Sequence, residues 1–256
     1  MDSTKQAPRP TLHGLRSGMA RAARGLAGCA LVLGALAAQG TAQAQAQDSS
    51  SIVLRGKDGW LFPGWGSLTQ VDRAGITEST RLITEARNLL AARGVKLQVL
   101  LLPDKVRFYA DKMPDGKAMS ADVQGRYKQV LQALQAAGIP SFDDEAVLRT
   151  VRDSGKDVFY RTDQHWTQAA ADATAEATAR MVQGEVPQLA GSAGSGLALG
   201  DTVTERRYGD LAELFLTADE RKQIGREVYT VRRQAPAKGL LDDEPAPVHV
   251  TGHSMV

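Results

Sequence analysis

The sequence lacks the features that mark several protein classes. One cysteine in 256 residues excludes an intramolecular disulfide framework and a cysteine-rich metal site. The 31 Lys and Arg residues are nearly balanced by 29 Asp and Glu residues, and a net charge of +2 is too small for an electrostatic nucleic-acid surface. Aromatic residues make up 5%, too few for platforms that stack single strands. We therefore expect no nucleic-acid partner.

Long hydrophobic runs are also missing, apart from one near the N-terminus. Leu26–Ala38 is apolar but shorter than the roughly 20 residues that a membrane-spanning helix needs. Arginines precede this run, and the small residues of Ala42-Gln43-Ala44 follow it, as in a cleavable export signal. We predict that residues 1–44 are a signal peptide, with an uncleaved anchor as the alternative, and that the mature protein is periplasmic.

The remainder, residues 45–256, has an ordinary globular composition and the length of one domain. Apolar residues at helical spacing predict helices near 77–94, 123–138, 146–151, 167–182 and 210–215. Short apolar or alternating runs predict strands at 96–102, 139–142, 158–160, 227–231 and 248–251, and residues 184–200 read as a flexible loop. The segment 56–62 predicts a tight turn at Asp58-Gly59 that enters a short strand. This alternation predicts an α/β fold with a mainly parallel sheet flanked by helices.

A polar loop, Arg161 to Thr167, follows the predicted strand 158–160. Loops at the carboxyl ends of strands build the active sites of open α/β sheets. The carboxylate of Asp163 could accept a hydrogen bond from one imidazole nitrogen of His165, fixing the tautomer so that the other nitrogen can act as a base. The competing interpretation is a helix N-cap made by Asp163 or Thr167, with His165 as a half-buried neighbour.

Ser254 is the second candidate for chemistry. It follows the predicted strand 248–251, and Gly252 allows the close backbone approach that an oxyanion hole requires. Taken alone, the segment could equally be a terminal turn. With His165 and Asp163 it would complete a set of nucleophile, base and orienting group. A helix should follow such a serine, so we expect the domain to be incomplete at its C-terminus.

Some polar residues could instead bind a metal ion or a substrate. Asp163, His165, His249 and His253 could supply a carboxylate and imidazoles to zinc, but their spacing matches no specific metal motif, so we predict no metal and no cofactor. A few residues could contact a substrate, although charged residues more often form a solvated face and aromatic residues more often belong to the core. The substrate-binding candidates are Lys105, Arg161 and Trp166.

These motifs resemble the AlgX/AlgJ-type alginate O-acetyltransferase family, whose domain is SGNH hydrolase-like with a circularly permuted motif order. The most specific match is Asp163-Gln164-His165-Trp166, which is similar to the family's Asp-x-His-Trp signature. The other matching segments are Gly56-Lys57-Asp58-Gly59-Trp60-Leu61-Phe62, Leu102-Pro103-Asp104-Lys105, Gly209-Asp210-Leu211 and Val250-Thr251-Gly252-His253-Ser254. His253 stands where the family usually has Asp, Asn or Thr.

The resemblance implies specific roles. Ser254 would be the nucleophile that carries an acetyl group as an ester, His165 the base and Asp163 its orienting group. The acceptor would be an exported polysaccharide such as alginate. A membrane-bound acyltransferase would supply acetyl groups, and export-complex proteins would be further partners. Two alternatives stay open: an O-acetylesterase with the same three residues, and a non-catalytic polysaccharide-binding module.

Overall fold

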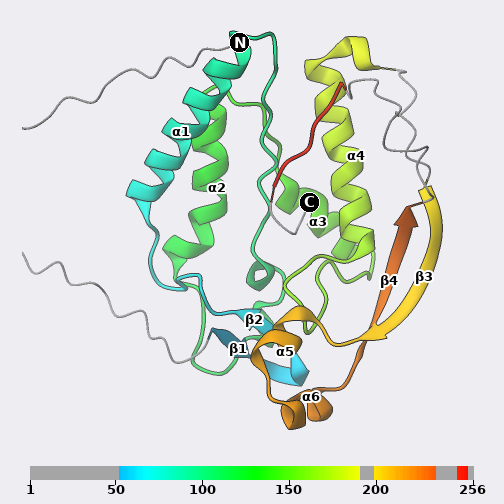
Figure 1. Cartoon of the computed structure of the whole chain (residues 1–256). Helices are drawn as coiled ribbons and strands as arrows, with labels where there is room; N and C mark the ends of the chain where they lie inside the picture. Colours follow the sequence, from blue (N-terminus) through cyan, green and yellow to red (C-terminus); the bar gives the residue numbers. More distant parts are fainter. Residues whose placement is uncertain (1–51, 191–198, 235–246, 253–256) are drawn as a thin grey trace, which may run out of the picture. The chain divides into compact units, whose positions relative to one another are not determined.

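The computed structural model of the chain describes residues 52–190, 199–234 and 247–252 (Figure 1). The predicted signal peptide, His253 and Ser254 lie outside these residues. The helices are α1 (Arg73–Ala91), α2 (Ala121–Ala136), α3 (Asp144–Asp153), α4 (Gln168–Glu185), α5 (Asp210–Phe215) and α6 (Ala218–Ile224). Four short 3-10 helices cover Lys57–Gly59, Lys105–Arg107, Ala110–Lys112 and Pro187–Leu189. The strands are β1 (Val53–Arg55), β2 (Leu61–Pro63), β3 (Leu199–Arg207) and β4 (Glu227–Gln234).

The long helices begin where local capping chemistry predicts. The side chains of Asp72, Ser120, Asp143 and Thr167 cap α1, α2, α3 and α4, and each accepts the backbone N–H three residues further on. All five predicted helices are present; the fifth, α5, follows Gly209 and has no side-chain cap. Helix α1 starts earlier than the expected Thr77, because Asp72 supplies the cap.

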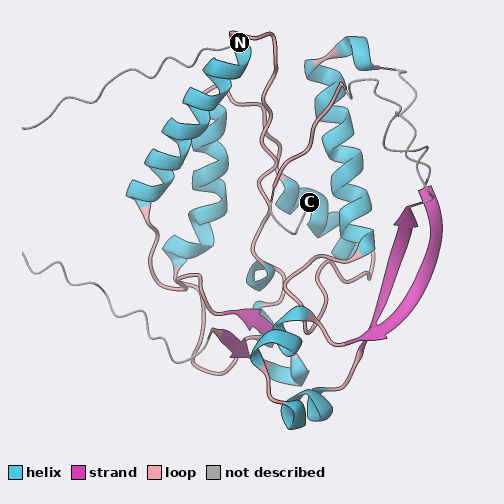
Figure 2. Ribbon diagram, viewed as in Figure 1, coloured by secondary structure: helices cyan, strands magenta, loops and turns pink. Residues whose placement is uncertain are grey.

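The prediction of a mainly parallel sheet is not confirmed. The strands of the described residues form two antiparallel two-stranded sheets, β1–β2 and β3–β4 (Figure 2). The expected strand 96–102 is an extended, mostly half-buried segment in which the Val99 N–H donates to the Pro140 carbonyl at 3.0 Å. Residues 139–142, 158–160 and 248–251 are likewise outside any strand, with one isolated bridge between Phe159 and Trp166.

The reason lies in what an apolar run specifies. Such a run makes burial favourable, but a strand also requires a neighbouring backbone in register along its length. The β3–β4 hairpin shows the converse. Strand β3 carries charged residues and begins inside the segment expected to be a flexible loop, yet it pairs with β4 along most of its length. The strand predicted at 227–231 is confirmed and extends to Gln234.

The core consists of two clusters that share strand β2. Side chains alternate across a strand, so Trp60 and Phe62 enter one cluster while Leu61 enters the other. The first cluster also contains Tyr109, from the segment that follows Pro103. Leu211 of α5 packs in the second cluster. The two clusters thereby hold both sides of the loop that follows Phe159, which contains the candidate site.

The turn before β2 depends on its glycines, as the sequence predicts. Asp58 and Gly59 both have positive φ (54° and 74°), a conformation that an Asp-Gly pair adopts readily. A side chain at Gly56 would overlap the Lys112 carbonyl oxygen, so only glycine fits there. No helix in the described part of the chain is long and apolar enough to cross a membrane.

Candidate active site

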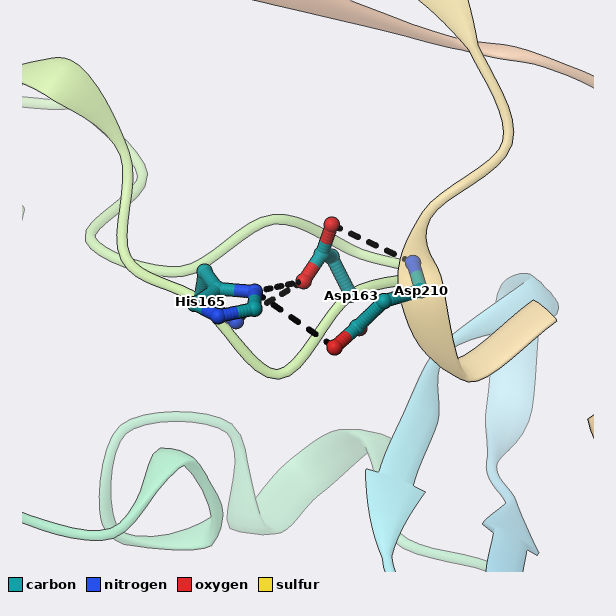
Figure 3. Close-up of side chains that lie close together, drawn as sticks. All are labelled: Asp163, His165 and Asp210. Atoms are coloured by element: carbon teal, nitrogen blue, oxygen red, sulfur yellow. Dashed lines mark hydrogen bonds and ion pairs between the residues drawn. The ribbon is translucent and has the colours of Figure 1, made fainter. Parts of the chain in front are cut away.

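Asp163 and His165 form a hydrogen-bonded pair in the loop before α4 (Figure 3). Asp163 Oδ1 lies 2.6 Å from Nδ1 of His165 and also accepts the His165 backbone N–H at 3.0 Å. The carboxylate is buried, whereas 26% of the His165 side chain is exposed. The pairing predicted from the two-residue spacing is therefore present, with the imidazole reaching the surface of the domain.

The other carboxylate oxygen of Asp163 is also bound. Oδ2 accepts the Tyr229 hydroxyl at 3.0 Å and the Asp210 backbone N–H at 3.2 Å. Burial acts to raise the pKa of Asp163, but hydrogen bonds from the Asp210 carboxyl, from His165 and from backbone N–H groups outweigh it and hold that pKa well below its usual range. Asp163 therefore stays ionised, as a group that orients an imidazolium must.

A second carboxyl group faces the same imidazole nitrogen. Asp210 Oδ2 lies 3.4 Å from His165 Nδ1 (Figure 3). Asp210 Oδ1 accepts the Gln164 N–H at 2.9 Å. Burial and the adjacent Asp163 carboxylate raise the pKa of Asp210 to about 6. Sequence reasoning matched Asp210 to a family segment without assigning it a role, because nothing in a linear sequence connects it to a residue 45 positions away.

The N-cap interpretation is confirmed for Thr167, one of its two candidates, and not for Asp163. The Thr167 hydroxyl caps α4 by accepting the Ala170 N–H. Asp163 lies outside the helix and is thereby left to bind His165. Helix capping and imidazole orientation are both present, divided between two side chains of one loop.

Asp163, His165 and Asp210 also satisfy the proximity that a metal site requires, since one ligand atom from each lies within 4.8 Å of the others. Both oxygens of Asp163 already accept two hydrogen bonds each. A cation would have to displace these donors, so the arrangement fits an oriented imidazole better than a metal ligand set. His249 is exposed and is not part of this cluster, and His253 lies outside the described residues.

The predicted substrate-binding residues have mostly internal contacts. Lys105 is 4% exposed and its ammonium group binds three backbone carbonyls, so its position does not support the predicted contact with a polymer. The Arg161 guanidinium donates to the carbonyls of Asp58 and Ile224. Trp166 is half-buried against the first core cluster. A role for Arg161 and Trp166 in substrate binding stays a prediction.

A pocket of about 260 Å³ includes Gln164, the residue next to His165, in its lining. Its wall combines the exposed ring of Trp65 with the polar side chains of Asp104 and Arg126. An aromatic face beside polar groups suits a sugar ring better than a purely apolar ligand. The site therefore has an adjoining pocket that could accept a substrate group.

Comparison with known proteins decides the family. Residues 53–256 match the model of the SGNH hydrolase-like domain, acetyltransferase AlgX. The chain belongs to this family. It is 34% identical over 125 residues to the probable alginate O-acetylase AlgJ of Pseudomonas aeruginosa, covering 48% of this chain and 31% of that protein. It is 28% identical over 212 residues to the AlgJ of Pseudomonas fluorescens, covering 79% and 52%.

Solved structures agree with this assignment. The O-acetyltransferase domain of Pseudomonas putida AlgJ superposes with a TM-score of 0.57 at 25% identity, over 72% of this chain and 65% of that one. Pseudomonas aeruginosa AlgX shares the fold, with a TM-score of 0.50 at 17% identity over 73% and 44%. The predicted SGNH hydrolase-like fold of the AlgX/AlgJ type is thus confirmed, and the permuted motif order stays a prediction. The chain spans about half or less of the curated relatives described above.

Proposed function

We propose that this chain is a polysaccharide O-acetyltransferase domain that uses Ser254, His165 and Asp163. The observation that carries the proposal is the buried, ionised Asp163 bound to His165 Nδ1 in a domain of the AlgX/AlgJ family. The relatives are named as probable alginate O-acetylases, which makes alginate or a similar exopolysaccharide the first acceptor to test. The pocket beside Gln164 would take a sugar unit of that acceptor.

The proposed reaction has two half-reactions. The Ser254 hydroxyl attacks the carbonyl carbon of a donor acetyl ester while His165 takes the hydroxyl proton, and the donor oxygen leaves with that proton. A sugar hydroxyl then attacks the acetyl-serine, again passing its proton to His165, which returns it to the serine oxygen. Asp163 keeps the imidazole oriented and stabilises its positive charge in both half-reactions.

The cellular setting is part of the same proposal. Residues 1–44 would direct export, and the domain would work in the periplasm. A membrane-bound acyltransferase would supply acetyl groups, and other proteins of a polysaccharide export complex would bring the acceptor. The arginines, the apolar run and the small residues of the first 44 positions support export, and the names of the relatives support a polysaccharide acceptor.

The first test is intact-mass spectrometry of the protein after incubation with an activated acetyl ester. Wild type, Ser254→Ala, His165→Ala and the control His249→Ala should be compared, since His249 is an exposed histidine that does not belong to the Asp163–His165–Asp210 cluster. We expect one added acetyl group on wild type and on the control, and none on the other two. A folded wild type that never gains the acetyl group contradicts the proposal.

A second experiment separates transfer from hydrolysis. The acetylated protein is mixed with deacetylated alginate oligomers or with buffer alone, and loss of the acetyl mass is followed over time. Loss that depends on the oligomer, with acetyl recovered on sugar, supports a transferase. Equal loss in buffer identifies an esterase, and oligomer binding that is unchanged in Ser254→Ala without any acetyl adduct identifies a binding module.

A further inference from the structure

The backbone of the site loop is held by two side chains of opposite charge. Lys105 lies 56 residues before Arg161 and Glu227 lies 66 residues after it. The ammonium group of Lys105 binds carbonyl oxygens of the loop, and the carboxylate of Glu227 binds its N–H groups. We propose that Lys105 and Glu227 are positioning residues that clamp Arg161–Asp163 and thereby set the Asp163–His165 geometry.

The Lys105 half of the clamp uses every donor of the ammonium group. Nζ lies 2.9 Å from the Arg161 carbonyl oxygen, 2.8 Å from that of Asp163 and 2.6 Å from that of Leu61 in β2. A protonated lysine has three N–H groups, so the three acceptors match it one for one. The loop is in this way tied directly to the strand that both core clusters share.

The surroundings of Lys105 explain how a buried cation is tolerated. The ammonium lies over the rings of Trp60 and Phe62, 5.1 and 5.3 Å from their centroids. Burial lowers the pKa of Lys105 to about 7, while the carboxylates of Glu227, Asp163 and Asp210 oppose that shift. At pH values below about 7 the ammonium form predominates, and its three N–H groups match the three carbonyl acceptors.

The Glu227 half binds N–H groups of the same loop and shares the peptide group between Arg161 and Thr162 with Lys105. One oxygen accepts the Arg161 N–H at 2.6 Å, and the other accepts the Thr162 N–H at 2.9 Å and the Thr162 hydroxyl at 2.8 Å. The Thr162 hydroxyl in turn accepts the Gly209 N–H at 3.1 Å. Together, Lys105 and Glu227 bind the carbonyl and amide groups on both sides of Thr162, leaving the Asp163 side chain directed at His165.

A misplacement of about 1 Å in a catalytic group can cost up to about a hundredfold in rate, so a weaker clamp should lower turnover without weakening substrate binding. We expect Lys105→Met to lower the kcat of acetyl transfer about tenfold or more, with KM within about twofold of wild type. Lys117→Met is the control, because Lys117 is exposed and changes the charge equally. This kcat measurement rests on the proposed function.

Two further measurements do not depend on acetyl-transfer activity. Amide hydrogen exchange of the wild type should show slow exchange at Arg161 and Thr162, and Glu227→Gln should speed it about tenfold or more at these two sites but not in α2 or α4. The control is Glu205→Gln, which makes the same charge change on the same hairpin, at a half-buried carboxylate that is paired with Arg233. The imidazole signals of His165, followed by NMR through a pH titration, should shift in Lys105→Met and Glu227→Gln but not in the controls.

The possible outcomes distinguish a failure of the clamp proposal from a failure of the proposed acetyltransferase function. A wild type that transfers no acetyl but shows the expected exchange and imidazole changes supports the clamp and contradicts the proposed function. Exchange at Arg161 and Thr162 that is the same in Glu227→Gln and Glu205→Gln overturns the clamp. A cooperatively folded Lys105→Met with wild-type kcat and unchanged His165 signals also overturns it. If Lys105→Met does not fold, the Glu227→Gln exchange and titration data decide.

Discussion

The Tyr229 hydroxyl lies 3.0 Å from Oδ2 of Asp163 and donates a hydrogen bond to it, although the two residues are 66 positions apart. Both side chains are almost completely buried. Burial and the neighbouring carboxylates of Asp163 and Glu227 raise the pKa of Tyr229 far above its usual range, so the phenol stays protonated and remains a donor. Strand β4 thus supplies support to both the carboxylate and the backbone of the site loop.

Replacing Tyr229 with Phe removes this donor and leaves the ring in place. Because a hydrogen bond to a charged group contributes about 1.5–3 kcal/mol, we expect the free energy of unfolding at pH 7 to fall by about that amount. Tyr160→Phe is the control, since the Tyr160 hydroxyl donates to an exposed backbone carbonyl and its ring packs against that of Tyr229. Equal urea denaturation midpoints for the two variants would contradict the prediction.

The two carboxyl groups beside His165 should titrate as a pair. In the wild type, we expect carbon-13 NMR to show Asp210 titrating near the value of about 6 that burial and Asp163 give it. Asp163→Asn removes the negative neighbour but not the burial, so the pKa of Asp210 should fall by about one pH unit without reaching that of an exposed carboxyl. Asp201→Asn, an exposed change on β3, should leave it unchanged. No change in Asp163→Asn would show that the two groups are uncoupled.

Gly209 is expected to tolerate no side chain. A Cβ atom there would overlap the carbonyl of Thr162, which also accepts the Ala212 N–H at 3.3 Å. We expect Gly209→Ala to lower the free energy of unfolding by about 1–3 kcal/mol, as overpacking does. Gly184→Ala in α4 meets no neighbour and should instead stabilise by up to about 1 kcal/mol, because alanine favours a helix. Thermal unfolding of the two variants tests the contrast, and parallel shifts in Tm would refute it.

Asp144, at the start of α3, makes stability depend on pH. It is fully buried, its Oδ1 accepts the Thr174 hydroxyl at 2.7 Å, and its Oδ2 has no hydrogen-bond partner among the described residues. Burial raises its pKa to about 6, above the value of about 3.9 expected in the unfolded chain. A raised carboxyl pKa means that the folded state binds the proton more tightly, so this group adds stability as the pH falls from about 6 to about 4.

Asp144→Asn should therefore be more stable than wild type at pH 7 by about 1–2 kcal/mol, because the asparagine carries no buried charge. The advantage should vanish near pH 4, where Asp144 is itself neutral. Chemical denaturation at a series of pH values measures the difference. Asp153→Asn, an exposed change in the same helix, is the control. An advantage that is constant from pH 7 to pH 4 would rule out this account.

Local chemistry was readable from the sequence wherever the cause lies within a few residues. The Asp163–His165 contact, the Thr167 cap and the Asp58-Gly59 turn each follow from a short spacing and the properties of the side chains concerned. Helices were likewise located because their apolar spacing and caps are local. The family resemblance rested on such short segments, and the comparison with known proteins confirmed it.

The pairing of distant segments was not readable in the same way. The apolar run at 96–102 predicts burial but does not indicate which backbone segment it lies beside. Strand β3 is rich in charged residues, so its sequence does not indicate that it pairs with β4. Lys105 looked like a surface cation, since its three carbonyl partners come from backbone that any sequence provides. The sequence did not indicate that Glu227 and Tyr229 support the site, because their partners in the site loop lie more than sixty positions away.

Glu227 and Tyr229 follow the site loop in the sequence, and this sets the order in which the contacts of the loop can form. A chain is made from its N-terminus, so the site loop and α4 exist before β4 has been synthesised. Until β4 docks, the N–H groups of Arg161 and Thr162 lack Glu227 as their acceptor, and Oδ2 of Asp163 lacks the Tyr229 hydroxyl, although Asp210 already precedes β4 in the chain. The site loop therefore gains the support of β4 last in the order of synthesis, so the reactive site is not fully held before the surrounding domain has formed.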